Sequence, residues 1–225
     1  MQPGQTLTDG NGHQVCLFPL QTISINQLWG NDSYSHCCSK AVDYGTGGTP
    51  TPAYAPCDIH LVYDPQRTAH TLFYSSDSPV VTPSGLSYIS IEVIHCDTEN
   101  FDPQPHFNQG DLFYWSGNAG IQSTGVHLHM EQNLLPDSIW INYHKKCRGT
   151  DGCYGLPDSV SPAEVFYVND TQVVNGRGLP WQKYEGGQPE PPDDPERPPA
   201  PAPPSGSGGR FKWYLFSDLI KRRRL

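Results

Sequence analysis

Short runs of β-branched and aromatic residues, separated by turn-forming clusters, recur along the first three quarters of the chain. Runs of this kind predict strands, and their even spacing predicts an antiparallel sheet. The predicted strands are residues 14–20, 59–63, 70–75, 88–95, 111–115, 126–132, 139–143 and 164–168. One helix signal, a serine before a proline at 159–166, competes with the last of these strands. We therefore expect a mainly β protein with an antiparallel sheet core.

Composition agrees with this pattern. The chain has 225 residues with 22 Gly, 23 Pro and only two Met, a balance that favours a turn-rich β protein over a helical bundle. Its 14 basic and 23 acidic side chains give a net charge of -9, which argues against nucleic acid as a partner. No apolar run approaches the roughly 18 residues of a membrane-spanning helix. The first ten residues lack a Sec signal pattern, so we expect a soluble chain that is not Sec-exported.

The composition changes abruptly at Gly186. Residues 186–209 contain nine prolines and end in SGSGG, which predicts a linker that is semi-rigid and then flexible. Residues 210–225 hold six of the 14 basic residues, one acid and several aromatic side chains. We expect a domain at 1–185, a linker at 186–209 and a basic-aromatic tail at 210–225. The tail suits an anionic membrane or wall surface, a groove on another protein such as a phage tail protein, or an edge strand of the domain.

Two histidines with a spacing of two carry the most chemical information. Because alternate residues of a strand share a face, His127 and His129 should point to one side while Leu128 and Met130 pack behind them. This arrangement suits a metal site. An isolated His-x-His pair is more often a surface feature, so the interpretation depends on the surrounding sequence.

The surrounding sequence resembles that of the lysostaphin/LytM-type zinc endopeptidases, which cut peptide cross-links of bacterial cell walls. The similarity rests on landmarks that occur in the family's order over roughly residues 16–132. They are CLFPLQTISI at 16–25, SHCCSKAVDYGT at 35–46, TPAYAPCDIHLVY at 51–63, EVIHCD at 92–97, FNQGDLFYWSGN at 107–118 and STGVHLHME at 123–131. The resemblance implies the antiparallel sheet core of that peptidase type.

Carried over residue by residue, the resemblance implies that His36, Asp43 and His129 bind Zn²⁺. His127 and His95 become the unligated catalytic histidines, the first as a general base and the second as a hydrogen-bond donor to the oxyanion. Three ligands leave one position for water, as a catalytic zinc site requires. The chain departs from the common pattern in one respect, because six residues instead of three separate His36 from Asp43. Tail-knob peptidases of some phages are similar in having this longer spacer.

The resemblance implies that the partner is bacterial peptidoglycan. Together with the missing signal peptide and the phage-like spacer, it predicts a phage lysin located in the virion tail or released to the host cell wall. A non-catalytic structural or wall-binding component with the same fold is the alternative.

Several other interpretations stay open at this point. Asp58 and His60 are substitute ligands, and Glu131 is expected to point away from the zinc. A cysteine peptidase would use Cys37, Cys38, Cys57 or Cys96, but no helix begins at these residues to activate a thiolate. The seven cysteines also permit disulfides between Cys147 and Cys153 and between Cys38 and Cys57.

Overall fold

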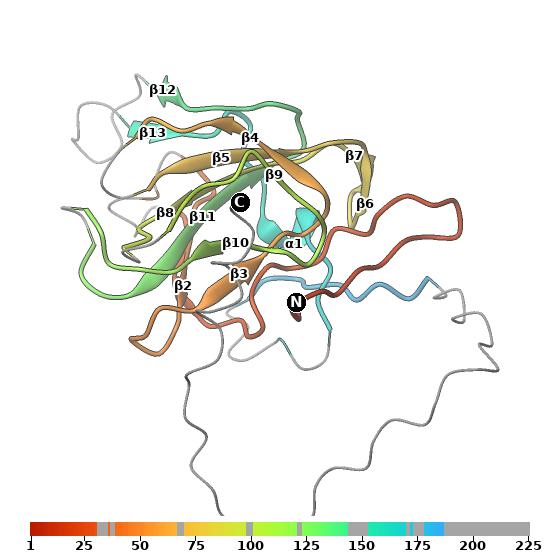
Figure 1. The fold of residues 1–225 in the computed structure, drawn as a ribbon, viewed down its shortest axis with the longest axis horizontal. Coiled ribbons are helices and arrows are strands. Elements are labelled where there is room, and N and C mark those ends of the chain that lie inside the picture. The colour runs from red at the N-terminus through yellow and green to blue at the C-terminus, as the bar shows by residue number, and fades with distance from the viewer. Residues whose placement is uncertain are drawn as a thin grey trace, which may run out of the picture. The chain divides into compact units, whose positions relative to one another are not determined.

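The computed structural model describes residues 1–30, 36, 39–66, 70–97, 101–120, 123–143, 153–169, 172 and 178–186. Strands dominate these ranges, and the only helix among them is a single turn (Figure 1). The prediction of a mainly β protein with an antiparallel core is confirmed. Almost all of the predicted linker and the whole predicted tail lie outside the described residues, so the domain boundaries stay predictions.

The strands are short, and most carry β-branched or aromatic residues. In chain order they are β1 (Ile25–Gln27), β2 (Val42–Gly45), β3 (Pro52–Tyr54), β4 (Ile59–Tyr63), β5 (Leu72–Ser76), β6 (Val80–Thr82), β7 (Gly85–Ser87), β8 (Ser90–Ile94), β9 (His106–Phe107), β10 (Leu112–Trp115), β11 (His127–Asn133), β12 (Ile141–Tyr143) and β13 (Cys153–Gly155).

Seven strands form one sheet in the order β1-β2-β11-β8-β5-β4-β9, and every pairing in it is antiparallel. The strand pairs β3–β10, β6–β7 and β12–β13 form separate two-stranded sheets. The longest strand, β11, lies between β2 and β8, although both precede it by more than 30 residues. This crossover brings three distant parts of the sequence side by side.

Six of the eight predicted strands are confirmed, with ends that shift by up to two residues. The prediction at 14–20 is wrong, because this segment forms only isolated bridges, such as Val15 to Val81. The predicted strand at 164–168 is also wrong, because the segment begins inside a helix. The competing helix signal was correct: α1 (Pro162–Val165) begins after the N-cap Ser161, whose side chain accepts from the Ala163 N–H while Glu164 bonds back to the cap. This capping box satisfies donors that a four-residue helix leaves open.

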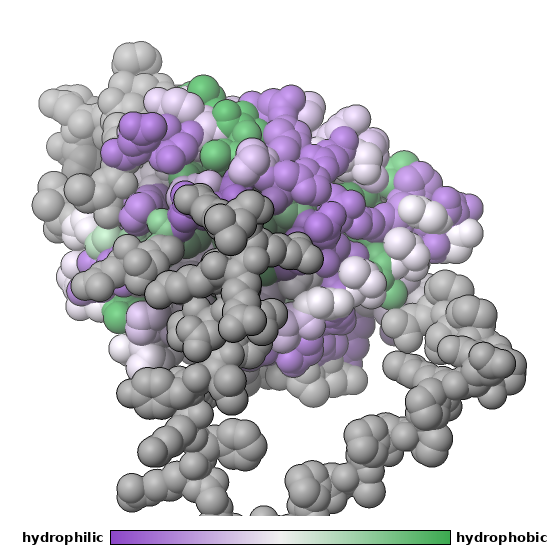
Figure 2. Space-filling view, viewed as in Figure 1, coloured by the Kyte–Doolittle hydropathy of each residue, from purple (hydrophilic) through white to green (hydrophobic). Residues whose placement is uncertain are grey.

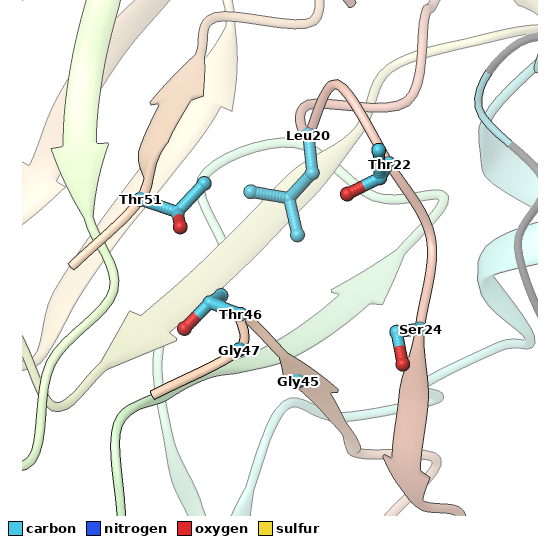
Figure 3. Close-up of a pocket in the computed structure, with 7 residues that line it drawn as sticks. All are labelled: Leu20, Thr22, Ser24, Gly45, Thr46, Gly47 and Thr51. Atoms are coloured by element: carbon cyan, nitrogen blue, oxygen red, sulfur yellow. The ribbon is translucent and has the colours of Figure 1, made fainter. Parts of the chain in front are cut away.

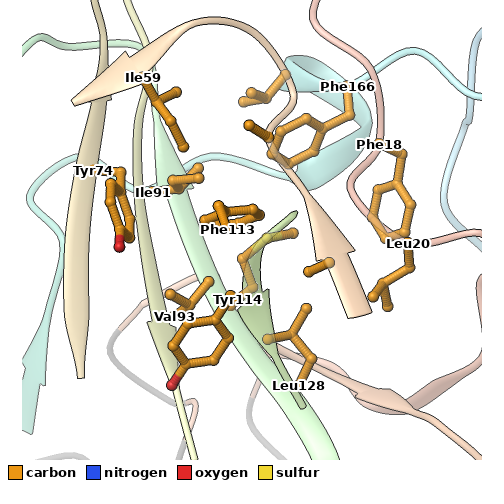
Figure 4. Packing of buried hydrophobic residues seen from close by; sticks show 14 of the residues in the cluster. Phe18, Leu20, Ile59, Tyr74, Ile91, Val93, Phe113, Tyr114, Leu128 and Phe166 are labelled. Atoms are coloured by element: carbon orange, nitrogen blue, oxygen red, sulfur yellow. The ribbon is translucent and has the colours of Figure 1, made fainter. Parts of the chain in front are cut away.

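One large hydrophobic cluster packs the seven-stranded sheet against the segments outside it. Alternation along β11 buries Leu128 and Met130 completely on the same side of the sheet as Ile91 and Tyr74. Figure 4 shows Leu128, Ile91 and Tyr74 in one cluster with side chains from outside the sheet, among them Phe18, Phe113 and Phe166. The buried face is therefore fixed by strand period, and the opposite face of β11 is left for polar side chains.

The described surface offers no broad apolar face in the view of Figure 2, where hydrophobic residues form small separate spots among hydrophilic ones. Within the described ranges, no helix has the length and apolar character that crossing a membrane requires. Cys57 is a free buried thiol beside Cys16, so the bridge from Cys38 is not formed. Cys147 and the side chain of Cys153 lie outside the described residues, and their pairing stays a prediction.

A polar network ties the far edge of the sheet to two loops. His60 in β4 contacts Asp77 through Nδ1 at 2.8 Å and Asp137 through Nε2 at 3.0 Å, and His106 in β9 contacts the same Asp77 at 2.6 Å. Carboxylates only accept hydrogen bonds, so both contacts of His60 are hydrogen bonds when its ring is protonated. Partial burial alone would lower the pKa of His60, but the bonds to Asp77 and Asp137 outweigh it and raise the pKa.

This network predicts a pH-dependent stability. A raised pKa in the folded state stabilises the fold fully below the unfolded value of about 6.5, and the contribution disappears as pH rises through the folded value. We expect His60→Gln to lower the free energy of unfolding at about pH 5 and to have little effect at about pH 9.5. The loss should stay under about 1 kcal/mol, because the groups are partly exposed. Urea unfolding of both proteins at the two pH values measures it, and an equal loss at both would contradict the prediction.

Candidate metal centre

Strand pairing places an aspartate and a histidine opposite each other. In the register of β2 and β11, Asp43 faces His129, and Asp43 Oδ1 lies 3.0 Å from His129 Nδ1. His127 shares this face two residues earlier, with Nε2 3.6 Å from the same oxygen. These side chains occupy the face of β11 that does not pack in the core. The predicted alternation of this strand is confirmed by the complete burial of Leu128 and Met130.

A third group arrives from the segment before β2. His36 is buried, and its Nε2 lies 3.3 Å from Asp43 Oδ1. Its ring contacts that of His129 edge to face, with centroids 4.9 Å apart. One ligand atom from each of His36, Asp43 and His129 lies within 4.8 Å of the other two. Two imidazole nitrogens and a carboxylate oxygen are a donor set that suits a catalytic zinc ion, so these residues fit the metal that the resemblance implied.

The electrostatics of this group also favour a cation. Burial would raise the pKa of Asp43, but hydrogen bonds from His129 and His36 outweigh burial and hold that pKa well below its usual range. Burial would lower the pKa of His129, yet its contacts with Asp43 and Glu131 raise it to about 10. In the absence of a metal ion, these two carboxylates thus hold a proton on His129. A divalent cation would displace that proton and satisfy Asp43 in its place.

Two further histidines flank the three candidate ligands. His95 follows β8, and its ring centroid lies 4.6 Å from that of His127 and 5.9 Å from that of His129. His95 Nδ1 donates to the carbonyl of Ala119 at 2.7 Å, and His127 Nδ1 donates to the carbonyl of Gly125 at 2.7 Å. Because a carbonyl only accepts, these bonds put the proton on Nδ1 of each neutral ring. Each Nε2 is then the nitrogen that can accept a proton.

His95 is held in an unusual backbone conformation, with φ of +86°. The Ala119 N–H donates to the His95 carbonyl at 3.1 Å, and the Tyr114 hydroxyl accepts from the Cys96 N–H at 3.0 Å. Burial, as the largest cause, lowers the pKa of His95 to about 4. The ring is therefore neutral at pH 7, and the donor role expected for its Nε2 requires that it first gain a proton.

The segment Gly117–Ala119 connects both flanking histidines. The backbone of Gly117 exchanges two hydrogen bonds with that of His127, at 3.0 and 3.1 Å, while Ala119 bonds His95. A Cβ at position 117 would collide with the His95 carbonyl oxygen and would lie 2.6 Å from the Asp97 nitrogen. This close approach explains why the sequence has glycine here.

We therefore expect Gly117→Ala to displace the backbone at His95 and to lower the free energy of unfolding by about 1–3 kcal/mol. Gly125→Ala is a matched control from the following turn, because a Cβ there meets nothing within 4 Å. Thermal unfolding of the two variants measures the difference. Equal melting temperatures would show that the contact at Gly117 does not constrain His95.

The structure brings together all five residues that the sequence indicated, but it separates the substitute ligands from them. Asp58 accepts from the Gln109 N–H at 2.8 Å, and His60 belongs to the network at the other edge of the sheet. Neither belongs to the group around Asp43.

Glu131 is not part of the group formed by His36, Asp43 and His129, but it does not lie on the opposite face of β11 either. Residues 127, 129 and 131 all share one face of β11, so strand period places Glu131 beside His129 and not away from it. Glu131 Oε1 lies 3.7 Å from His129 Nε2, and the side chain is only 3% exposed. The alternation that paired the two histidines was also the signal that could have located this glutamate.

The described cysteines do not favour a cysteine peptidase. Cys16, Cys57 and Cys96 are fully buried. Burial and then a hydrogen bond with Cys57 raise the pKa of the Cys16 thiol, which opposes thiolate formation. Cys37 and Cys38 lie outside the described residues.

A small pocket of about 310 Å³ lies on another part of β2 (Figure 3). Its lining includes Gly45 and the hydroxyl side chains of Thr22, Ser24, Thr46 and Thr51. None of the lining residues is titratable or contributes to the histidine cluster. The reactive groups of the described residues therefore gather at Asp43 and not in this pocket.

No family model matches the chain. The chain is similar to Morphogenesis protein 1 of Bacillus phage B103, with 30% identity over 187 residues that cover 79% of this chain and 47% of that protein. It thus spans about half the length of this curated relative. Among solved structures, a zinc-containing peptidase from Vibrio cholerae matches with a TM-score of 0.37 and 14% identity, over 56% of this chain and 40% of that one.

Proposed function

We propose that this chain is a zinc-dependent endopeptidase that cleaves peptide cross-links of bacterial peptidoglycan. The observation that carries the proposal is the convergence of His36, Asp43 and His129 beside two further histidines whose Nε2 atoms can accept protons. A purely structural metal site would have four closed ligands and would not need such neighbours.

His36 Nε2, Asp43 Oδ1 and His129 Nδ1 would hold the ion. A bound zinc ion would supply Lewis-acid chemistry, which activates water and polarises a peptide carbonyl near neutral pH. The remaining steps fall to the protein. His127 Nε2, 3.6 Å from Asp43 Oδ1, is placed to accept the proton of an attacking water.

His95 has a complementary position. Its bond to Ala119 fixes the ring orientation, and its Nε2 can donate to a developing oxyanion or to the leaving amine once it carries a proton. The ring lies next to His127, so a proton that leaves the water has two neighbouring acceptors. We assign the first acceptance to His127, because it lies closer to Asp43.

The substrate class and the biological setting rest on the sequence. The ordered landmarks resemble those of wall-cutting peptidases, and the relative from phage B103 is named a morphogenesis protein. We infer a phage protein that acts on the host wall, either as part of the virion tail or after release. The second candidate, a structural component of phage assembly, is favoured by the relative's name alone.

Three variants separate these functions. We expect about one zinc ion per chain in the wild-type protein and loss of turbidity when it is added to bacterial walls. His129→Ala should lose zinc and activity together, because it removes a ligand. His127→Ala should keep zinc but lose about 100-fold or more in turnover, because it removes only the proton acceptor. Metal analysis and wall digestion measure the two properties.

His106→Ala is the control, since His106 belongs to the distant network around Asp77. It should keep both zinc and activity. A wild-type protein that binds zinc but releases no new amine from walls would favour the structural candidate. Absence of zinc from the wild-type protein would overturn the proposal that the chain is a zinc peptidase.

The tail at 210–225 is proposed as an attachment element for an anionic membrane or wall surface or for a phage tail protein. Its composition is basic and aromatic, whereas the rest of the chain carries eight basic and 22 acidic residues. The proline-rich stretch before it is a spacer that would keep it away from the catalytic group.

Deletion of residues 205–225 should therefore leave the turnover of a small soluble peptide nearly unchanged while it weakens association with cells, liposomes or virion proteins. Peptide cleavage assays and co-sedimentation measure the two effects. Loss of peptide cleavage or of folding in the truncated protein would show that the tail belongs to the domain.

A further inference from the structure

A buried glutamate lies directly behind one of the metal-binding histidines. Glu131 is two residues beyond His129 on β11 and is 3% exposed. Its Oε1 lies 3.7 Å from His129 Nε2, while the other ring nitrogen, Nδ1, faces Asp43 at 3.0 Å. His129 is thus aligned between two carboxylates, one on each ring nitrogen.

Glu131 itself is fixed by donors from two other segments. The Ser39 hydroxyl donates to Oε1 at 2.7 Å, and the Leu156 N–H donates to Oε2 at 2.8 Å. The backbone at the end of β13 packs closely against it: a Cβ at Gly155 would lie 2.9 Å from Oε2 and 2.8 Å from Ser39 Cβ. Any other rotamer of Glu131 would break these two hydrogen bonds and leave a buried carboxylate without donors, which is costly.

We propose that Glu131 is a positioning residue, which orients His129 for metal binding through Nδ1 and couples this ligand to the segment that carries His36. The proposal rests on the zinc-binding function proposed above. At 3.7 Å the carboxylate is beyond a direct hydrogen bond, so it acts on the Nε2–H as a fixed neighbouring charge. A carboxylate behind a ligating imidazole fixes the tautomer and makes the ligand more basic.

The coupling to His36 runs through Ser39. Ser39 follows His36 by three residues and donates to the same oxygen of Glu131 that faces His129. Glu131 and Ser39 therefore provide a second connection, besides Asp43, between His129 and the segment that precedes β2. This second connection matters because the spacer between His36 and Asp43 is long.

Glu92 provides a matched control. It lies directly opposite Glu131 in the pairing of β8 with β11 and is equally buried, at 1% exposure. Its carboxylate accepts a hydrogen bond from Trp140 Nε1. The two glutamates thus share strand position, burial and charge, but Glu131 is the one that contacts a zinc ligand.

The test is zinc affinity of the full chain, measured by competition with a chromophoric chelator. Glu131→Gln should weaken zinc binding about 10- to 100-fold, and Glu92→Gln should leave it unchanged. The visible absorption of the Co²⁺-loaded protein should shift for Glu131→Gln and not for Glu92→Gln, because only the first alters the basicity of a ligand. Ser39→Ala, which keeps the carboxylate but removes its donor, should give a smaller loss of affinity.

Equal zinc affinity and equal Co²⁺ spectra for Glu131→Gln and the wild type would overturn the positioning role while leaving the proposed peptidase intact. If Glu131→Gln does not fold, unchanged affinity in Ser39→Ala overturns the role. Zinc binding without wall cleavage by the wild type would refute the peptidase and leave the positioning role standing. Absence of zinc binding by the wild type would overturn both.

Discussion

The antiparallel pairing of β2 with β11 is the constraint on which the candidate site depends. This pairing sets Asp43 opposite His129 and places a partly buried carboxylate among imidazoles. A buried carboxylate is costly unless it is paired and hydrogen-bonded, so the histidines around Asp43 are a condition of the fold as well as of the chemistry. The hydrophobic face of β11 fixes the register, because a slip of one residue would move Leu128 and Met130 out of the core.

The residues around this pair differ in backbone conformation: some lie on regular strands, and one has a strained backbone. The candidate ligands Asp43 and His129 lie on regular strands, which are held in place by core packing on the opposite face. His95 instead takes a positive φ after the end of β8 and is held there by the backbone of Gly117–Ala119. Strain of this kind persists only where neighbouring bonds fix it, and it occurs here at the histidine that follows the end of β8.

A second feature is the concentration of acidic side chains around His129. Asp43 and Glu131 contact the two nitrogens of His129, and Glu92 is buried on the next strand. Like charges opposite each other in a sheet destabilise it unless each has its own donors. Here Ser39 and Leu156 donate hydrogen bonds to Glu131, and Trp140 donates one to Glu92. Segments outside β8 and β11 are therefore needed to stabilise this face of the sheet.

The sequence by itself determined the fold class and six of the thirteen described strands, and it indicated the five residues of the candidate site. The reason is that alternation in β11 is local, and the ordered landmarks around His36, Asp43, His95, His127 and His129 are visible without coordinates. It did not predict β2, because VDYG is too short and too polar to read as a strand, although this strand carries Asp43. Nor did it predict that 14–20 forms isolated bridges, since its apolar residues are buried without a ladder. Only the tertiary structure decided the tautomer of His95, the backbone strain at His95 and the donors of Glu131, because each depends on groups that folding brings from distant segments.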